Sequence, residues 1–215
     1  MNSIKKIIQN KSFKNIIEWI IPIAIGLTVA IIIRLFLVVP VTVSGDSMFP
    51  NLHDKERTFA FLPAQIKRGS VVAFDARAED PGIQPGQKYY IKRVIGIPGD
   101  TVKAENGKLF VNGKEVNQEY LDKSQKNAGT GNWDLTLLSS GNSEWTTTTS
   151  HWNDKKANKV PANSYFVLGD NRAESEDSRY FGFVSKKHIL GVDYKYPWAS
   201  NKKEVNSQWK EFFAK

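Results

Sequence analysis

Ser47 could act as a nucleophile because it lies in an irregular stretch of the chain, between Gly45 and Pro50. The stretch reads Ser-Gly-Asp-Ser-Met-Phe-Pro-Asn-Leu over residues 44–52. Gly, Asp, Ser and Pro are also the ordinary turn residues, so a simple turn is the alternative interpretation. A serine hydroxyl is a weak nucleophile at neutral pH and needs a base within hydrogen-bond reach. Catalysis by Ser47 therefore requires the chain to supply such a base.

Lys92 is the candidate base, in a strand predicted for Tyr89–Ile95. Because side chains alternate between the two faces of a strand, Lys92 shares a face with Tyr90 and Val94. One interpretation is an edge-strand lysine whose amine reaches water. The other is a buried amine, whose pKa falls below the usual value of about 10.4. A neutral amine can accept the proton of a serine hydroxyl, which predicts acyl-transfer chemistry by a Ser-Lys pair.

A Ser-His-Asp triad is the rival arrangement. The residues around Ser47 lack the second glycine of the G-x-S-x-G motif, and His53 beside Asp54 has no recognisable setting. His151 and His188 are scattered and match no metal motif such as H-E-x-x-H. The sequence has no cysteine, which excludes a thiol nucleophile, disulfides and thiolate metal sites. We predict neither a metal nor a cofactor.

Residues 169–179 form a third polar stretch, which follows a strand predicted for Ser164–Leu168. A solvated turn with acidic and basic residues is the simple interpretation. A loop at the end of a strand is also where a rigid scaffold can carry a site. An ion pair between Asp177 and Arg179 that braces this loop is equally natural.

The elements that must position these residues begin with an apolar run over residues 16–39, charged only at Glu18 and Arg34. Its 24 residues reach about 36 Å as a helix, enough to cross a hydrocarbon core of about 30 Å. Residues 1–15 carry four lysines and no acidic residue. By the positive-inside rule they stay in the cytoplasm and the rest of the chain lies outside.

A cleavable export signal is the alternative for this run. It is disfavoured because apolar sequence continues well beyond the small-x-small candidate at residues 24–26. We therefore predict an uncleaved, single-pass helix in the cytoplasmic membrane.

The remaining sequence is mostly β in character, with short apolar runs between Gly and Pro residues. The dipeptides Asn106-Gly107 and Asn112-Gly113 are tight turns typical of a β-meander. Residues 124–158 are rich in Ser, Thr, Asn and Gly, and we expect their tryptophans to pin a small, loop-rich lobe. Further β structure is predicted at residues 180–184 and 188–194, and a short helix from Asn201.

The formal net charge is +8, from 30 Lys and Arg against 22 Asp and Glu. The positive residues are spread along the chain and form no aromatic-basic RNA motif. We interpret the charge as membrane compatibility and solvation, and predict no nucleic-acid partner. About 190 residues outside the helix suffice for one domain or a core with a smaller lobe.

The apolar run and four motifs together resemble bacterial type I signal peptidases of the Gram-positive type. The motifs are residues 44–50, Arg68-Gly69-Ser70-Val71-Val72-Ala73-Phe74, Lys92-Arg93-Val94-Ile95-Gly96-Ile97-Pro98-Gly99-Asp100, and Gly169-Asp170-Asn171 through Ser178-Arg179. Their order and spacing match over nearly the whole chain. The resemblance implies a membrane-bound serine endopeptidase that removes signal peptides from exported preproteins, so its partners would be preproteins and the lipid bilayer.

The resemblance also implies roles for individual residues. Ser47 matches the nucleophile of the family, Lys92 its general base, and Ser175 a serine that orients the lysine. Asp177 and Arg179 match a structural ion pair near the site. The implied fold is mostly antiparallel β: a catalytic core over residues 40–100 and 164–200, a variable second β lobe over residues 101–163, and a tail over residues 201–215.

Gly45 departs from the pattern of some family members, which place a serine there to help bind the oxyanion. The oxyanion would then rest on the Ser47 N–H and a second donor that the sequence does not name. Losing one such donor typically costs a factor of about 10² to 10³ in rate.

Two alternatives stay open: a specialised peptidase for a narrow set of surface proteins, and an inactive relative acting as a scaffold. Loss of Ser47 or Lys92 would mark the second, and both residues are present.

Overall fold

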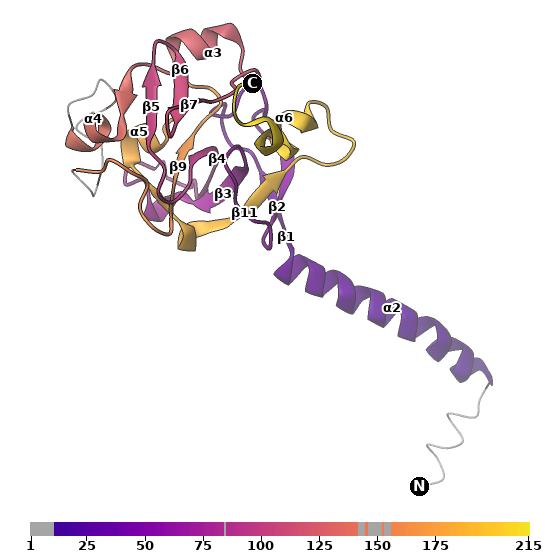
Figure 1. The fold of residues 1–215 in the computed structure, drawn as a ribbon. Coiled ribbons are helices and arrows are strands. Elements are labelled where there is room, and N and C mark those ends of the chain that lie inside the picture. The colour runs from indigo at the N-terminus through magenta and orange to yellow at the C-terminus, as the bar shows by residue number, and fades with distance from the viewer. Residues whose placement is uncertain (1–10, 84, 142–144, 146–151, 153–155) are drawn as a thin grey trace. The chain divides into compact units, whose positions relative to one another are not determined.

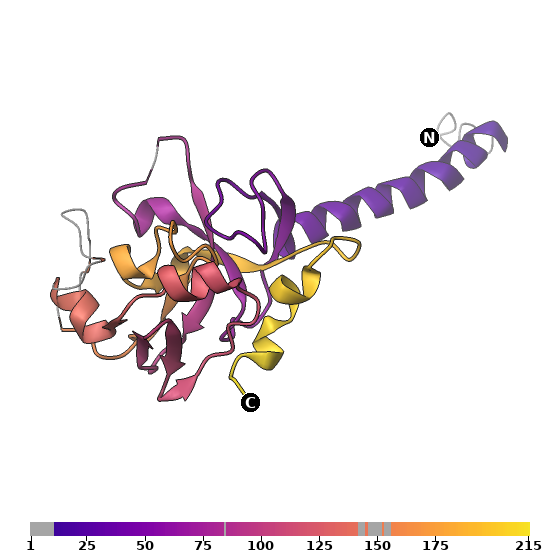
Figure 2. The same cartoon turned by 90° about the horizontal axis from the view of Figure 1, so that it is seen from above.

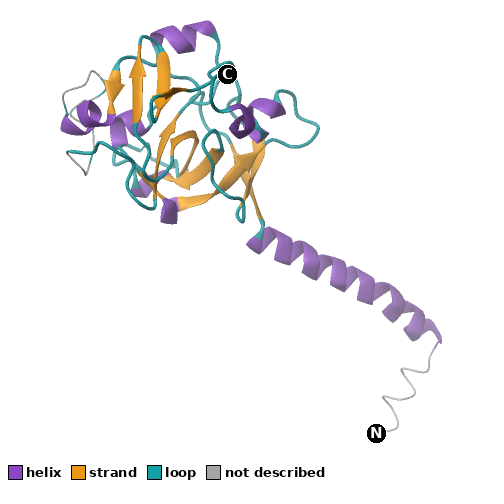
Figure 3. Ribbon diagram, in the orientation of Figure 1, coloured by secondary structure: helices purple, strands orange, loops and turns teal. Residues whose placement is uncertain are grey.

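The computed structural model of the chain describes residues 11–83, 85–141, 145, 152 and 156–215. The chain divides into two compact units, with the boundary between Val39 and Pro40. The first is helical and the second contains almost all of the strands (Figures 1 and 3). Of the predicted cytoplasmic segment, residues 1–15, the first ten lie outside the described residues.

The N-terminal unit is one long helix, α2 (Lys11–Phe36), drawn in indigo in Figure 1. Its stretch Glu18–Phe36 is long and apolar enough to span a membrane. Large apolar side chains are exposed along it, including Trp19 at 76%. A helix that exposes apolar groups to this extent needs an apolar environment. The helix therefore fits a membrane anchor, but it ends at Phe36 and not at the predicted Val39, because strand β1 begins at Val38.

The larger sheet of the second unit has seven strands in the order β1-β2-β11-β3-β4-β9-β10. The strands are β1 (Val38–Thr42), β2 (Arg57–Phe61), β3 (Val71–Asp75), β4 (Tyr89–Gly96), β9 (Ser164–Leu168), β10 (Val184–Ser185) and β11 (Ile189–Tyr194). The pairs that give a register are antiparallel. Strand β4 lies inside the sheet, between β3 and β9, so the edge-strand interpretation of Lys92 is wrong.

A smaller sheet of four strands has the order β7-β6-β5-β8. The strands are β5 (Val102–Glu105), β6 (Lys108–Val111), β7 (Lys114–Glu115) and β8 (Trp133–Asp134). Asn106-Gly107 and Asn112-Gly113 form its two tight turns, with left-handed backbone at all four residues. The predicted meander is confirmed. The C-terminal segment lies beside this sheet (Figure 2), because Phe213 bridges to Val116.

Short helices complete the fold. They are α3 (Lys123–Ala128), α4 (Leu135–Ser140), α5 (Ser178–Phe181) and α6 (Lys202–Asn206), with 3-10 turns η1 (Ala76–Ala78), η2 (Lys186–His188) and η3 (Gln208–Glu211). The predicted mostly β, antiparallel fold with a second, smaller β lobe is confirmed.

Alternation along β4 and β9 separates two hydrophobic clusters. Tyr90 and Val94 of β4 pack with Val167 of β9 in one cluster. Ile95 of β4 and Phe166 of β9 belong to the other. The second cluster also contains the apolar side chains of the small sheet, so the lobe and the large sheet share one core.

Two local predictions need correction or refinement. Residues 180–184 were expected to be β, but Tyr180 and Phe181 end α5 and only Val184 enters a strand. The Asp177 carboxylate caps α5 by accepting from the N–H of Arg179, which favours a helical turn over extended backbone. Residues 124–158 contain two short helices and a strand within the described part. The expected role of the tryptophans is confirmed, because Trp133 and Trp152 are buried in the shared core and Trp145 packs against it.

Helix α4 offers a matched test of this shared core. Leu138 is fully buried, whereas its neighbour Leu137 is 37% exposed. We expect Leu138→Ala to lower the free energy of unfolding by about 2 to 5 kcal/mol, because it leaves a cavity. Leu137→Ala should cost about 1 kcal/mol or less. Denaturant unfolding of the full chain in detergent measures both, and equal losses would show that α4 is not part of the core.

Candidate active site

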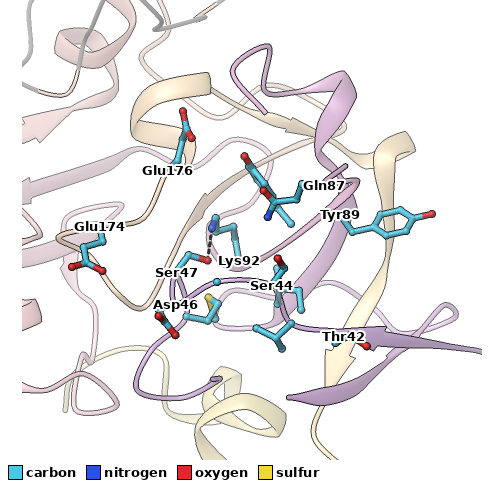
Figure 4. A pocket seen from close by; sticks show the side chains of 14 residues that line it. Thr42, Ser44, Asp46, Ser47, Gln87, Tyr89, Lys92, Glu174 and Glu176 are labelled. Atoms are coloured by element: carbon cyan, nitrogen blue, oxygen red, sulfur yellow. Dashed lines mark hydrogen bonds between the residues drawn. The ribbon is translucent and has the colours of Figure 1, made fainter. Parts of the chain in front are cut away.

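Lys92 and Ser47 meet directly, although 45 residues separate them in sequence. The Nζ of Lys92 donates a hydrogen bond to the Oγ of Ser47 at 2.7 Å (Figure 4). Lys92 is only 3% exposed and comes from the interior strand β4. Ser47 is half-buried in the turn that follows β1. The burial expected for Lys92 is confirmed.

Burial lowers the pKa of Lys92 to about 8. Desolvation is the largest cause, because the charged amine loses its hydration inside the protein. The carboxylates of Asp177 and Glu176 oppose the shift, and the guanidinium of Arg179 supports it. The amine also lies 5.0 Å from the centre of the Tyr90 ring. A substantial fraction of the amine is therefore neutral in mildly alkaline solution.

Buried apolar side chains hold the turn that carries Ser47. Met48 is 1% exposed and Leu52 is fully buried. The carbonyl of Met48 accepts from the N–H groups of Asn51 and Leu52 at 2.9 and 3.0 Å, which closes a helical turn. Gly45 precedes Ser47 with a φ of 79°, in the left-handed region that favours glycine. These features hold Ser47 in a half-buried position, next to the buried side chain of Met48.

The backbone N–H of Ser47 donates to no acceptor among the residues that the structure describes. Ser47 borders a cleft of about 290 Å³, lined by residues 42–48, 87, 89–92, 174 and 176. Glu174 and Glu176 approach this cleft from the loop after β9, opposite Thr42 and Ser44 (Figure 4). Ser47 and Lys92 thus line the same cleft.

Asp177 and Arg179 form the ion pair that the sequence predicted. Both side chains are fully buried, and the guanidinium donates from Nε to Oδ1 and from Nη2 to Oδ2, each at 2.8 Å. Burial opposes ionisation of Asp177, but the charge and hydrogen bonds of Arg179 prevail and lower its pKa. The second oxygen of Asp177 also accepts from the N–H of Gly169. The pair therefore ties α5 to the end of β9.

Ser175 is buried beside the same loop. Its Oγ has no hydrogen-bond partner among the described residues. A Cβ built on Gly169 would lie 2.1 Å from this Oγ and 2.4 Å from the Ser47 carbonyl oxygen, so both serines pack against Gly169. The structure places Ser175 at the site without a hydrogen bond to Lys92, and its orienting role stays a prediction.

A second buried ion pair lies behind the site and was not predicted. Arg93 follows Lys92 and points to the opposite face of β4, where it donates to both carboxylate oxygens of Asp170 at 2.8 and 2.7 Å. Asn51 of the nucleophile turn donates to the same carboxylate at 2.9 Å. The alternation of β4 could have revealed this pair, because a buried arginine needs a carboxylate.

The described histidines do not complete a triad. His53 packs edge-on against Phe49, and His188 pairs with Glu79. Within the described part of the chain, no group of three His, Asp or Glu residues could hold a metal ion. The third histidine, His151, lies outside the described residues. The geometry therefore supports the Ser-Lys arrangement over Ser-His-Asp.

Comparison with known proteins gives the class to which this fold and site belong. A family described as "Signal peptidase, peptidase S26" matches residues 16–198. The chain therefore belongs to the signal peptidase family, peptidase S26, and the resemblance drawn from the sequence motifs is confirmed.

Individual relatives are similar over most of their length. Signal peptidase I P of Bacillus subtilis subsp. natto is 37% identical, covering 86% of this chain and 90% of the relative. Signal peptidase IB of Staphylococcus aureus strain COL is 35% identical, covering 91% and 97%. A crystal structure of a signal peptidase I from Enterococcus faecalis V583 is 32% identical, with a TM-score of 0.43, and covers 60% of this chain and 97% of that chain.

Gly169 provides a test of how closely the two loops must approach. We expect Gly169→Ala to lower the free energy of unfolding by about 1 to 3 kcal/mol, because its Cβ has no room between Ser47 and Ser175. Gly82→Ala is the matched control, since its Cβ would meet nothing closer than the Asp80 carboxylate at 3.2 Å. Thermal unfolding measures both, and equal stability of the two variants would contradict this packing.

Proposed function

We propose that the chain is a membrane-bound signal peptidase that uses Ser47 as nucleophile and Lys92 as general base. The observation that carries this proposal is the hydrogen bond between a buried amine of lowered pKa and a serine hydroxyl. Family membership supplies the reaction class, cleavage of signal peptides from preproteins. The substrates are therefore exported preproteins that carry a signal peptide.

The reaction begins when neutral Lys92 takes the proton of Ser47 as the oxygen attacks the scissile carbonyl carbon. The carbonyl oxygen becomes negatively charged and accepts from the Ser47 N–H and a second donor, which remains unassigned. Collapse of this intermediate breaks the peptide bond, and Lys92 gives its proton to the departing amine of the mature protein. The signal peptide stays bound as an ester, which a water activated by Lys92 hydrolyses.

The neighbouring residues support this chemistry by position. Asp177 and Arg179 form an ion pair and act on Lys92 in opposite directions, so Asp177 raises the pKa of the amine less than it would alone. Ser175 lies beside the nucleophile turn, across Gly169, with an unpartnered hydroxyl among the described residues that could orient the lysine. We assign Ser175, Asp177 and Arg179 as positioning residues.

We also propose that α2 anchors the enzyme in the cytoplasmic membrane, with the N-terminus in the cytoplasm and the domain after Val39 outside. The apolar stretch Glu18–Phe36 and the lysines of residues 1–15 support this orientation. Enzyme and substrate then meet in one plane, which raises the effective concentration of signal peptides at the cleft.

The dyad predicts a defined pH dependence. The active form needs a neutral Lys92, so kcat/KM should rise with pH through a midpoint near 8 and fall about tenfold for each pH unit below it. Ser47→Ala and Lys92→Met should each abolish cleavage of a precursor peptide. Lys92→Met should fold at least as stably as the wild type, because no charged amine then has to be desolvated.

Cleavage retained by either variant would remove the dyad from the mechanism. A midpoint near the pKa of a free lysine would instead remove the desolvation argument.

The absence of cysteine allows a clean test of orientation. Ser3→Cys and Lys123→Cys, made separately, each introduce a single thiol. In intact cells, a membrane-impermeant maleimide should label Lys123→Cys and should reach Ser3→Cys only after lysis. The reverse labelling pattern would show the opposite orientation.

A further inference from the structure

Asn171 bonds two consecutive carbonyl groups of the nucleophile turn. Its side-chain Nδ2 donates to the carbonyl oxygen of Asp46 at 3.1 Å. Its backbone N–H donates to the carbonyl oxygen of Ser47 at 3.0 Å. Asn171 is 5% exposed and comes from the loop after β9. One residue from a distant part of the chain therefore fixes both peptide groups that flank the Ser47 α-carbon.

The first of these peptide groups contains the N–H of the proposed oxyanion site. The carbonyl of Asp46 and the N–H of Ser47 belong to one trans peptide, in which C=O and N–H point in opposite directions. A bond that fixes the direction of the carbonyl therefore fixes the direction of the N–H. Donation to the carbonyl also polarises the peptide and makes its N–H a stronger donor.

The Asn171 amide is itself held in one orientation. Its Nδ2 also donates to Glu174 Oε2 at 3.0 Å, so both amide hydrogens face acceptors. Exchanging the amide oxygen and nitrogen would place the oxygen against those two acceptors. The neighbouring Asp170 is locked to Arg93 by a fully buried ion pair, which fixes the loop to the sheet.

The turn does not supply this constraint by itself. The N–H of Phe49 also donates to the Asp46 carbonyl, at 2.9 Å, but Phe49 belongs to the same turn and moves with it. Only a donor from another element can hold the peptide relative to Lys92, which is fixed on β4. The side-chain amide of Asn171, on the loop after β9, is such a donor.

We propose that Asn171 is the positioning residue that aims the Ser47 N–H at the oxyanion. The inference rests on the proposed Ser-Lys mechanism. Asn171 does not touch the reacting atoms; it acts through the peptide between Asp46 and Ser47. Its loss leaves the dyad intact and weakens only the binding of the negatively charged oxygen.

The test compares two inhibitors on Asn171→Ala and Asn171→Asp, each in the full chain in detergent. A peptide aldehyde forms a covalent adduct, in which Ser47 Oγ bonds to the aldehyde carbon, its proton passes to Lys92, and the aldehyde oxygen becomes the oxyanion. The matching peptide alcohol fills the cleft without forming this adduct. Asn171→Asp keeps the side-chain shape but turns an acceptor toward the Asp46 carbonyl and Glu174, so its effect should be at least as large as that of Asn171→Ala. Circular dichroism checks that each variant is folded.

We expect kcat to fall about 10- to 100-fold, less than full loss of an oxyanion donor because the Phe49 bond remains. Affinity for the aldehyde should fall by the same factor. Affinity for the alcohol, KM and the pH midpoint near 8 should stay unchanged. A purely structural role would reduce the folded fraction without changing the ratio of the two affinities.

Asn112→Gly is the matched control, because it removes side-chain bonds to Asp100 and Thr101 in the small sheet, and glycine tolerates its φ of 52°. It should lower the melting temperature and leave the affinity ratio unchanged. An unchanged ratio in the folded Asn171 variants overturns the inference and leaves the dyad intact. Cleavage by Ser47→Ala would instead overturn the proposed function.

Discussion

Proton transfer from Ser47 to Lys92 requires a neutral amine, and the burial of Lys92 favours that state. Strand β4 lies inside the large sheet, with Tyr90 and Val94 on the same face as the amine. A carboxylate beside such an amine would restore its charge. Asp177 and Glu176 both act on the amine in this direction, and Arg179, which forms a bidentate pair with Asp177, opposes them. The ion pair thus influences the charge of the amine and also braces the loop.

The nucleophile turn depends on a second constraint, the close approach of the loop after β9. Gly169 allows this approach, because any larger residue would meet Ser47 and Ser175. Asn171 then bonds the turn from one side, and Asn51 extends from the turn to Asp170 on the other. The serine with its N–H donor and the lysine come from separate segments. Their relative positions are set by the sheet and by these contacts between loops.

Much of the site could be predicted because its signals are local. The period-two pattern of residues 89–95 predicts a strand and places Lys92 on the same face as Tyr90. The turn residues around Ser47 predict irregular backbone there. The helix at residues 178–181 and the link from Asn171 to Asp46 could not be predicted in this way. The helix depends on the Asp177 side chain that caps it. The link depends on a contact between residues 125 positions apart, which a local sequence pattern cannot predict. The motifs located these residues, but their partners came from the folded chain.

The back-to-back arrangement of Lys92 and Arg93 has a consequence for how the sequence of β4 can change. One face of the strand carries an amine that must lose its charge, and the other carries a guanidinium whose charge is matched by Asp170. A single-residue insertion or deletion before Lys92 would exchange the two faces. The guanidinium, which stays protonated at any physiological pH, would then face Ser47. Evolution of this strand is therefore confined to substitutions, and length variation must occur elsewhere in the chain.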